Sequence, residues 1–163
     1  HPGRTMTAYL VLKYLHVTGA AMLLGTGTGI AFFMLMAHRT GDAATIAATA
    51  RIVVTADFVF TATAVVAQPV TGLLLADTVG YSLGEGWIVA SLALYLVTGA
   101  FWLPVVWMQA KMRDLASEAA RTGAPLPQPY YRLYRTWFAF GFPAFAAVLA
   151  IFWLMIARPE MAL

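Results

Sequence analysis

IVVTADFVFTATAVVAQPVTGLLLA, residues 52–76, is the stretch that decides the fold of this chain. Only one charged residue, Asp57, and one amide, Gln68, interrupt it. At a rise of 1.5 Å per residue a helix of this length reaches about 37 Å, and a hydrocarbon core is about 30 Å thick. Backbone N–H and C=O groups find no water there, so the stretch is predicted to be a membrane-spanning helix.

Three further apolar runs have the same character. Of the 163 residues, 61% are hydrophobic and 10% are charged, whereas soluble domains carry about 25% charged residues. We therefore predict an all-α fold, a single membrane domain over residues 1–163 built as a four-helix bundle. The expected spans are about 8–37, 52–76, 87–110 and 133–157. The chain has no cysteine, which excludes disulfides, thiolate metal sites and thiol catalysis.

The basic residues predict the orientation of the bundle. Seven of the ten flank the connections between the first and second and between the third and fourth spans: Arg39, Arg51, Lys111, Arg113, Arg121, Arg132 and Arg135. Lysine and arginine favour the cytoplasmic side, so both termini are expected outside, in the inner membrane of a bacterium. The net charge of +3 follows from this distribution and does not indicate nucleic-acid binding. Residues 1–5 precede Met6 and look vector-derived, so His1 is not counted as a ligand.

Polar and small side chains form one stripe on each of the first three spans. Spacings of three and four residues place such side chains on one helix face, which must turn inward because lipid cannot satisfy them. The stripe of the second span is Asp57, Thr61, Ala64, Gln68 and Gly72, and that of the third is Ser91, Tyr95, Thr98, Trp102 and Gln109. The first span contributes Lys13, His16, Ala20, Leu24 and Gly27.

Counting from the span ends divides these side chains into two layers. His16, Gln68 and Tyr95 each lie about eight residues, or about 12 Å, from the outer end of their helices, so they are expected to meet. Asp57, Gln109 and Arg135 are expected to form an inner layer for proton handling or an ion pair. Simpler interpretations stay open: His16 as a core histidine, Gln68 as a side chain that hydrogen-bonds between helices, and Asp57 in a structural ion pair with Arg135 or Arg51.

Several motifs resemble known membrane proteins. Similarity over nearly the whole chain to an uncharacterised family of predicted bacterial integral membrane proteins is carried by Ala56–Phe58, Gln68–Gly72, Trp102–Gln109 and Arg135–Phe138. The run LKYLHVTGA, residues 12–20, is similar to the first helix of the four-helix proteins HemJ, a membrane protoporphyrinogen oxidase, and CopD-type copper-resistance proteins.

The HemJ resemblance implies haem b, with His16 as an axial ligand of the iron. The second ligand in that family is a lysine on the third helix. Residues 86–95 contain no lysine, and Ser91 is the nearest polar candidate, so Gln68, Tyr95 or water would face the iron from the other side. Gly19 would let a flat ring approach the backbone.

Three functions stay open at this point. The first is a redox-related protein that binds haem b or quinone. The second is a small proton- or metal-coupled carrier that works as an oligomer. The third is an accessory subunit whose partner, besides the lipid bilayer, is another membrane protein. No motif of a hydrolase is present.

Overall fold

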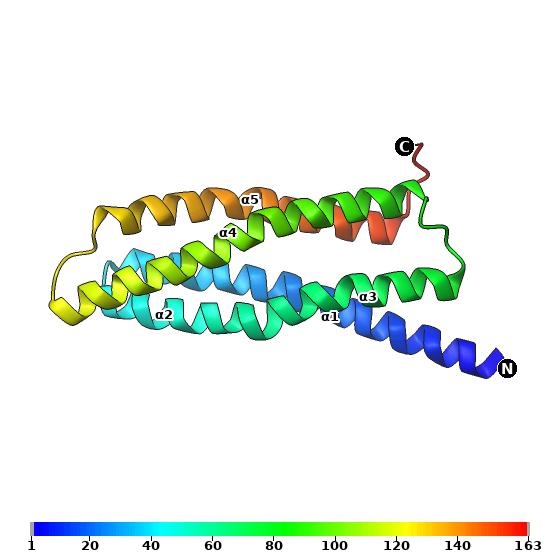
Figure 1. The fold of residues 1–163 in the computed structure, drawn as a ribbon, viewed down its shortest axis with the longest axis horizontal. Coiled ribbons are helices and arrows are strands. Elements are labelled where there is room, and N and C mark those ends of the chain that lie inside the picture. The colour runs from blue at the N-terminus through cyan, green and yellow to red at the C-terminus, as the bar shows by residue number, and fades with distance from the viewer. Residues whose placement is uncertain (1, 163) are drawn as a thin grey trace.

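The computed structural model describes residues 2–162, so His1 and Leu163 lie outside the described residues. The fold is all-helical, as predicted, and four helical segments are long and apolar enough to cross a membrane: Gly3–Thr40, Ala43–Val79, Gly86–Thr122 and Gln128–Ala157. The elements are α1 (Pro2–Thr40), α2 (Ala43–Ala56), a π-helical turn η1 (Asp57–Thr61), α3 (Ala62–Val79), α4 (Gly86–Thr122) and α5 (Gln128–Ala157). In Figure 1, α2, η1 and α3 form one continuous rod beside α1, and both ends of the chain lie at the same end of the bundle.

The helices are longer than the predicted spans because capping, and not hydropathy, sets their ends. The Asp42 carboxylate accepts hydrogen bonds from the Thr45 backbone N–H at 2.9 Å and from the Thr45 hydroxyl at 2.6 Å, which starts α2 at Ala43. Both bonds lower the pKa of the Asp42 carboxyl group below its usual value, and the bond from the Thr45 hydroxyl has the larger effect. A glycine sets the end of α4: the helix stops at Thr122 because the next residue, Gly123, takes a left-handed conformation with φ +68°.

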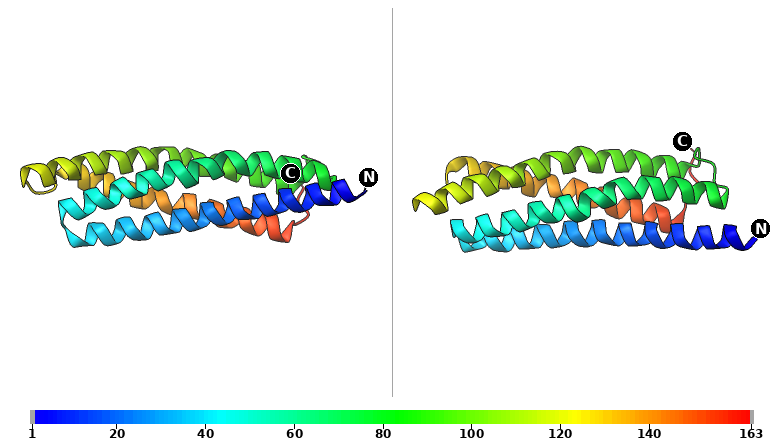
Figure 2. Two further views of the ribbon diagram at one scale, coloured as in Figure 1. Left: turned by 90° about the horizontal axis from the view of Figure 1, so that it is seen from below. Right: turned by 60° about the horizontal axis from the view of Figure 1, so that its bottom comes forward.

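The helices pack in an uneven way along the bundle. Helix α4 packs along α5, α1 packs along α3, and α2 packs on α4. Figures 1 and 2 show the consequence: α4 runs beside α5 where it begins and reaches α2 where it ends. Within residues 2–162, α3 and α4 do not form a closely packed pair. The bundle is therefore packed most tightly at the end that holds α2, while a smaller buried cluster of Ala76, Trp87, Ile88 and Leu154 joins α3, α4 and α5 at the end that holds the termini.

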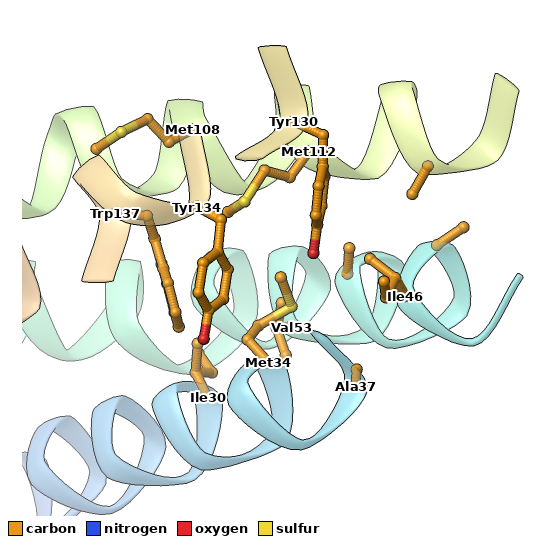
Figure 3. Close-up of a cluster of buried hydrophobic side chains, with 13 residues drawn as sticks. Ile30, Met34, Ala37, Ile46, Val53, Met108, Met112, Tyr130, Tyr134 and Trp137 are labelled. Atoms are coloured by element: carbon orange, nitrogen blue, oxygen red, sulfur yellow. The ribbon is translucent and has the colours of Figure 1, made fainter. Parts of the chain in front are cut away.

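The tight end contains the main hydrophobic cluster, shown in Figure 3. Met34 from α1, Ile46 from α2 and Met112 from α4 are each 0% exposed. From α5, Tyr134 and Trp137 enter the same cluster, and the Tyr134 ring also stacks on His38 with centroids 3.5 Å apart. All four spanning segments thus contribute to one core, whose side chains interlock in place of lipid.

Truncating one methionine in this core and one that faces lipid tests how much the core contributes to the free energy of unfolding. Met34→Ala should lower the free energy of unfolding by about 2 kcal/mol, because it leaves a cavity that its neighbours fill only in part. Met36→Ala is the matched control: Met36 is 36% exposed, and its loss should cost less than about 0.5 kcal/mol. Detergent-induced unfolding followed by circular dichroism measures both, and equal losses would contradict the assigned core.

Candidate functional site

The outer polar layer centres on His16, which is half-buried on α1 and turned toward α3. Its Nδ1 lies 2.9 Å from the hydroxyl oxygen of Thr71. The same hydroxyl is 2.8 Å from the backbone carbonyl of Ala67, one turn earlier in α3, and donates its single proton there. With the Thr71 proton assigned to Ala67, the Thr71 oxygen accepts from His16, and the imidazole then carries its proton on Nδ1.

This tautomer leaves Nε2 of His16 as the nitrogen with a free lone pair. In the described chain only two side-chain atoms are fully buried without a partner, Gln68 Oε1 and Trp102 Nε1. Nε2 makes none of the hydrogen bonds found among the described residues and is not one of these fully buried atoms, while the Gln68 backbone carbonyl also lies near the ring. A histidine held through one N–H with the other nitrogen open is the arrangement that metal-binding histidines show.

Two glycines let the helices close around this histidine. A Cβ atom added to Gly72 would lie 2.9 Å from Cε1 of His16, so α3 meets the ring edge through bare backbone. A Cβ atom added to buried Gly19 would clash with the side-chain oxygen of Gln68. The predicted group of His16, Gly19 and Gln68 is thus brought together, with Thr71 as an additional member.

Tyr95 reaches the same part of α3 but binds backbone and not His16. Its hydroxyl donates to the carbonyl of Val65. Pro69 lies four residues after Val65 and has no N–H, so it leaves this carbonyl without its helical donor. Tyr95 therefore replaces the missing hydrogen bond from a neighbouring helix and ties α4 to α3 where the two are otherwise poorly packed.

Ser91 is buried on α4, but its hydroxyl donates to the carbonyl of Trp87 at 2.7 Å, within its own helix. The hydroxyl of Ser91, the predicted candidate for the second ligand, is thus bonded to the preceding turn of its own helix. Among the described residues no hydrogen bond joins Ser91 to His16.

The inner layer is a hydrogen-bonded network of side chains from η1, α4 and α5. Asp57 in η1 is 3% exposed and accepts from the Thr61 hydroxyl through Oδ1 at 2.8 Å. The amide of Gln109, 1% exposed, satisfies both its neighbours in one orientation: its NH₂ donates to Asp57 Oδ2 at 2.6 Å, and its oxygen accepts from the Trp137 indole at 3.0 Å. Trp102 lies beside the same carboxyl group without a well-formed hydrogen bond.

The placement of Arg135 in this layer was wrong. Arg135 is exposed on α5 and makes no ion pair with Asp57, and exposed Arg51 makes none either. Trp137, two residues further along, enters the layer instead. In lipid a guanidinium reaches the interface more cheaply than it enters the bundle, whereas an indole buries most of its surface and still donates a hydrogen bond.

Comparison with known proteins agrees with this architecture. The family model described as "Predicted integral membrane protein (DUF2269)" matches residues 10–159, which include both polar layers and parts of all four spanning segments. The chain belongs to this family. No curated protein and no solved structure matches it.

Three features of this DUF2269 member were not predicted from its sequence. They are the hydrogen bond of Thr71 to His16, the entry of Trp137 into the inner layer, and the π-helical turn at Asp57. A fourth unpredicted feature, the pairing of Tyr95 with the Val65 carbonyl, had a usable signal, because a proline frees the carbonyl four residues before it. The π-helical turn had none in a single sequence.

The bond between Tyr95 and Val65 can be tested by a double-mutant cycle. Tyr95→Phe leaves the carbonyl of Val65 unpaired and should destabilise the bundle by about 1–2 kcal/mol. In a Pro69→Ala background residue 69 regains an N–H that can reach this carbonyl, so the same change should cost much less. Unfolding of the four proteins in detergent gives the coupling energy, and strictly additive losses would contradict the assignment.

Proposed function

We propose that this chain is a bacterial inner-membrane protein that binds haem b in the outer half of its bundle, with His16 as the protein ligand to the iron. The observation that carries the proposal is the fixed tautomer of His16, whose Nδ1 is held by Thr71 while Nε2 is left open. Gln68 and Gly19 lie in the same layer. The similarity of residues 12–20 to the first helix of HemJ-like proteins adds support.

The donor set favours haem over the alternatives. The described residues contain no group of three histidine, cysteine or acidic side chains that would hold a bare metal ion. A porphyrin supplies four nitrogens itself and needs only one imidazole from the protein, as in globins. A quinone carbonyl would need a donor, and Nε2 of His16 has no proton in this tautomer, so quinone is the weaker candidate.

The residues fit a haem held by one histidine and not by two. The other described histidine, His38, lies near the opposite end of α1, with Nδ1 2.9 Å from the Tyr130 hydroxyl. Since Tyr95 is engaged by Val65, Gln68 or water would be the other donor offered to the haem. Bound haem would supply one-electron chemistry, which gives the chain a redox-related role in the membrane.

An absorption spectrum tests the proposal directly. Protein purified after expression with added haem precursor should show a Soret band, and His16→Ala should abolish it because the iron loses its protein ligand. Thr71→Val should keep the ligand but release its orientation, with a loss of haem affinity of about 10-fold to 100-fold.

His38→Ala is the matched control, since it removes an equally half-buried histidine from the same helix and should leave the band unchanged. A colourless wild-type protein would refute haem binding. So would a Soret band that persists in His16→Ala, because the iron would then be held elsewhere.

We propose further that both termini face away from the cytoplasm. The end of the bundle that holds the links α1–α2 and α4–α5 also holds most of the basic residues, and both termini lie at the other end, as Figure 1 shows.

The chain lacks cysteine, so single cysteines report the orientation without background. Ser82→Cys, in the link between α3 and α4, should react with a membrane-impermeant maleimide in intact spheroplasts. Ala124→Cys, in the link between α4 and α5, should react only after the membrane is opened. Both sites are exposed, and the reverse labelling pattern would overturn the orientation.

A further inference from the structure

Asp57 is a buried acid without a cation. It is 3% exposed near the middle of the α2–η1–α3 rod, about 20 Å from the start of α2. The ion pairs of the described chain, Arg113–Asp114 and Arg121–Glu118, both lie on α4 and do not involve it. An ionised carboxylate without a counter-ion is expensive in hydrocarbon, so such residues are rare in membrane spans and mark ion or proton sites.

No titratable neighbour replaces that counter-ion. Helix α4 brings Gln109 and Trp102 to the carboxyl group, and neither titrates. From α5, Trp137 reaches only the Gln109 amide, while the nearby Tyr134 stacks on His38 and packs against Trp137. The described residues of α1, α2 and α3 place no charged side chain within hydrogen-bonding or ion-pair distance of Asp57.

The network fixes which carboxyl oxygen can take a proton. An indole N–H can only donate, so Trp137 forces the oxygen of the Gln109 amide toward itself and the NH₂ toward Asp57. Oδ2 therefore always accepts. Oδ1 faces the Thr61 hydroxyl, and a hydroxyl both donates and accepts. When a proton binds Oδ1, the Thr61 hydroxyl can turn so that its oxygen accepts a hydrogen bond from the new O–H group.

The π-helical turn is what frees Thr61 for this exchange. Other threonines inside the helices, such as Thr63, Thr71 and Thr98, donate to the carbonyl four residues earlier. Thr61 does not: it donates to the Asp57 side chain, and the Asp57 carbonyl accepts from the Ala62 N–H, five residues on. Single π turns inside α-helices occur frequently at functional sites.

We propose that Asp57 is an intramembrane proton-binding site, in which a proton enters at Oδ1, Thr61 changes from donor to acceptor, and Gln109 holds Oδ2 throughout. The ligand is the proton itself, taken from water, and no other bond is made or broken. The site is separate from His16 and does not depend on haem binding.

Infrared difference spectroscopy of the protein in liposomes tests this site. Lowering the pH should produce a carboxylic-acid C=O band that Asp57→Asn removes and that Asp77→Asn, at an exposed acid near the end of α3, leaves in place. Gln109→Leu should move the band to higher wavenumber, because it removes the donor to the C=O oxygen, Oδ2. Thr61→Val should move it little, since its partner is the oxygen that carries the proton.

The same experiment can overturn the proposal. If the acid band is identical in Asp57→Asn, or if Thr61→Val shifts it and Gln109→Leu does not, the assigned site or the assigned oxygen is wrong. Should Asp57→Asn fail to fold, the intact chain labelled with ¹³C-carboxyl aspartate replaces it. A labelled C=O band with slow deuterium exchange supports the site, and a band that exchanges as fast as exposed acids refutes it.

Discussion

Lipid offers no hydrogen bonds, so each polar group inside the spans has to find its partner within the bundle. The α2–η1–α3 rod carries most of these groups, and its partners decide which helices meet it. Thr71 binds His16 of α1, the Val65 carbonyl binds Tyr95 of α4, and Asp57 binds Gln109 of α4. The lipid-facing side chains impose no comparable order, because they are equally stable against acyl chains or one another.

The two halves of the bundle satisfy this requirement differently. At the inner end, α1, α2, α4 and α5 interlock around Met34, Met112 and Tyr134, so packing fixes the helices. Toward the end that holds the termini, α3 meets α1 through glycine and histidine, and it meets α4 through Tyr95 and through a smaller hydrophobic cluster around Ala76 and Trp87. The space beside Gly19 and Gly72 is filled there by the side chains of Gln68 and His16, so polar side chains close this end where apolar ones close the other.

Hydropathy and the 3.6-residue period are properties of the chain alone, so the sequence was enough to predict the four spans and the inward faces of the second and third. The face predicted for the first span is inward only in part, since Lys13 and Gly27 are exposed. The depth and helix face of each residue also predicted that His16, Gly19 and Gln68 lie together and that Asp57 lies near Gln109. It did not separate Arg135 from Trp137, since both lie near the same depth and only the rotation of α5 decides which one enters. Side-chain partners such as Thr71 depend on how two helices are turned, which one sequence does not specify.

Two threonines in the same rod illustrate how backbone geometry assigns chemistry to one residue type. Thr71 sits in a regular α-helix, so its proton is committed to the Ala67 carbonyl and its oxygen is a fixed acceptor for His16. Thr61 sits in the π-helical turn, where its hydroxyl binds a carboxyl oxygen and can reverse direction. A fixed acceptor suits a ligand whose tautomer must not change, and a reversible one suits a proton site. This difference is why we propose a cofactor for the outer layer and a proton for the inner layer, although both are built from an ionisable side chain and a hydroxyl.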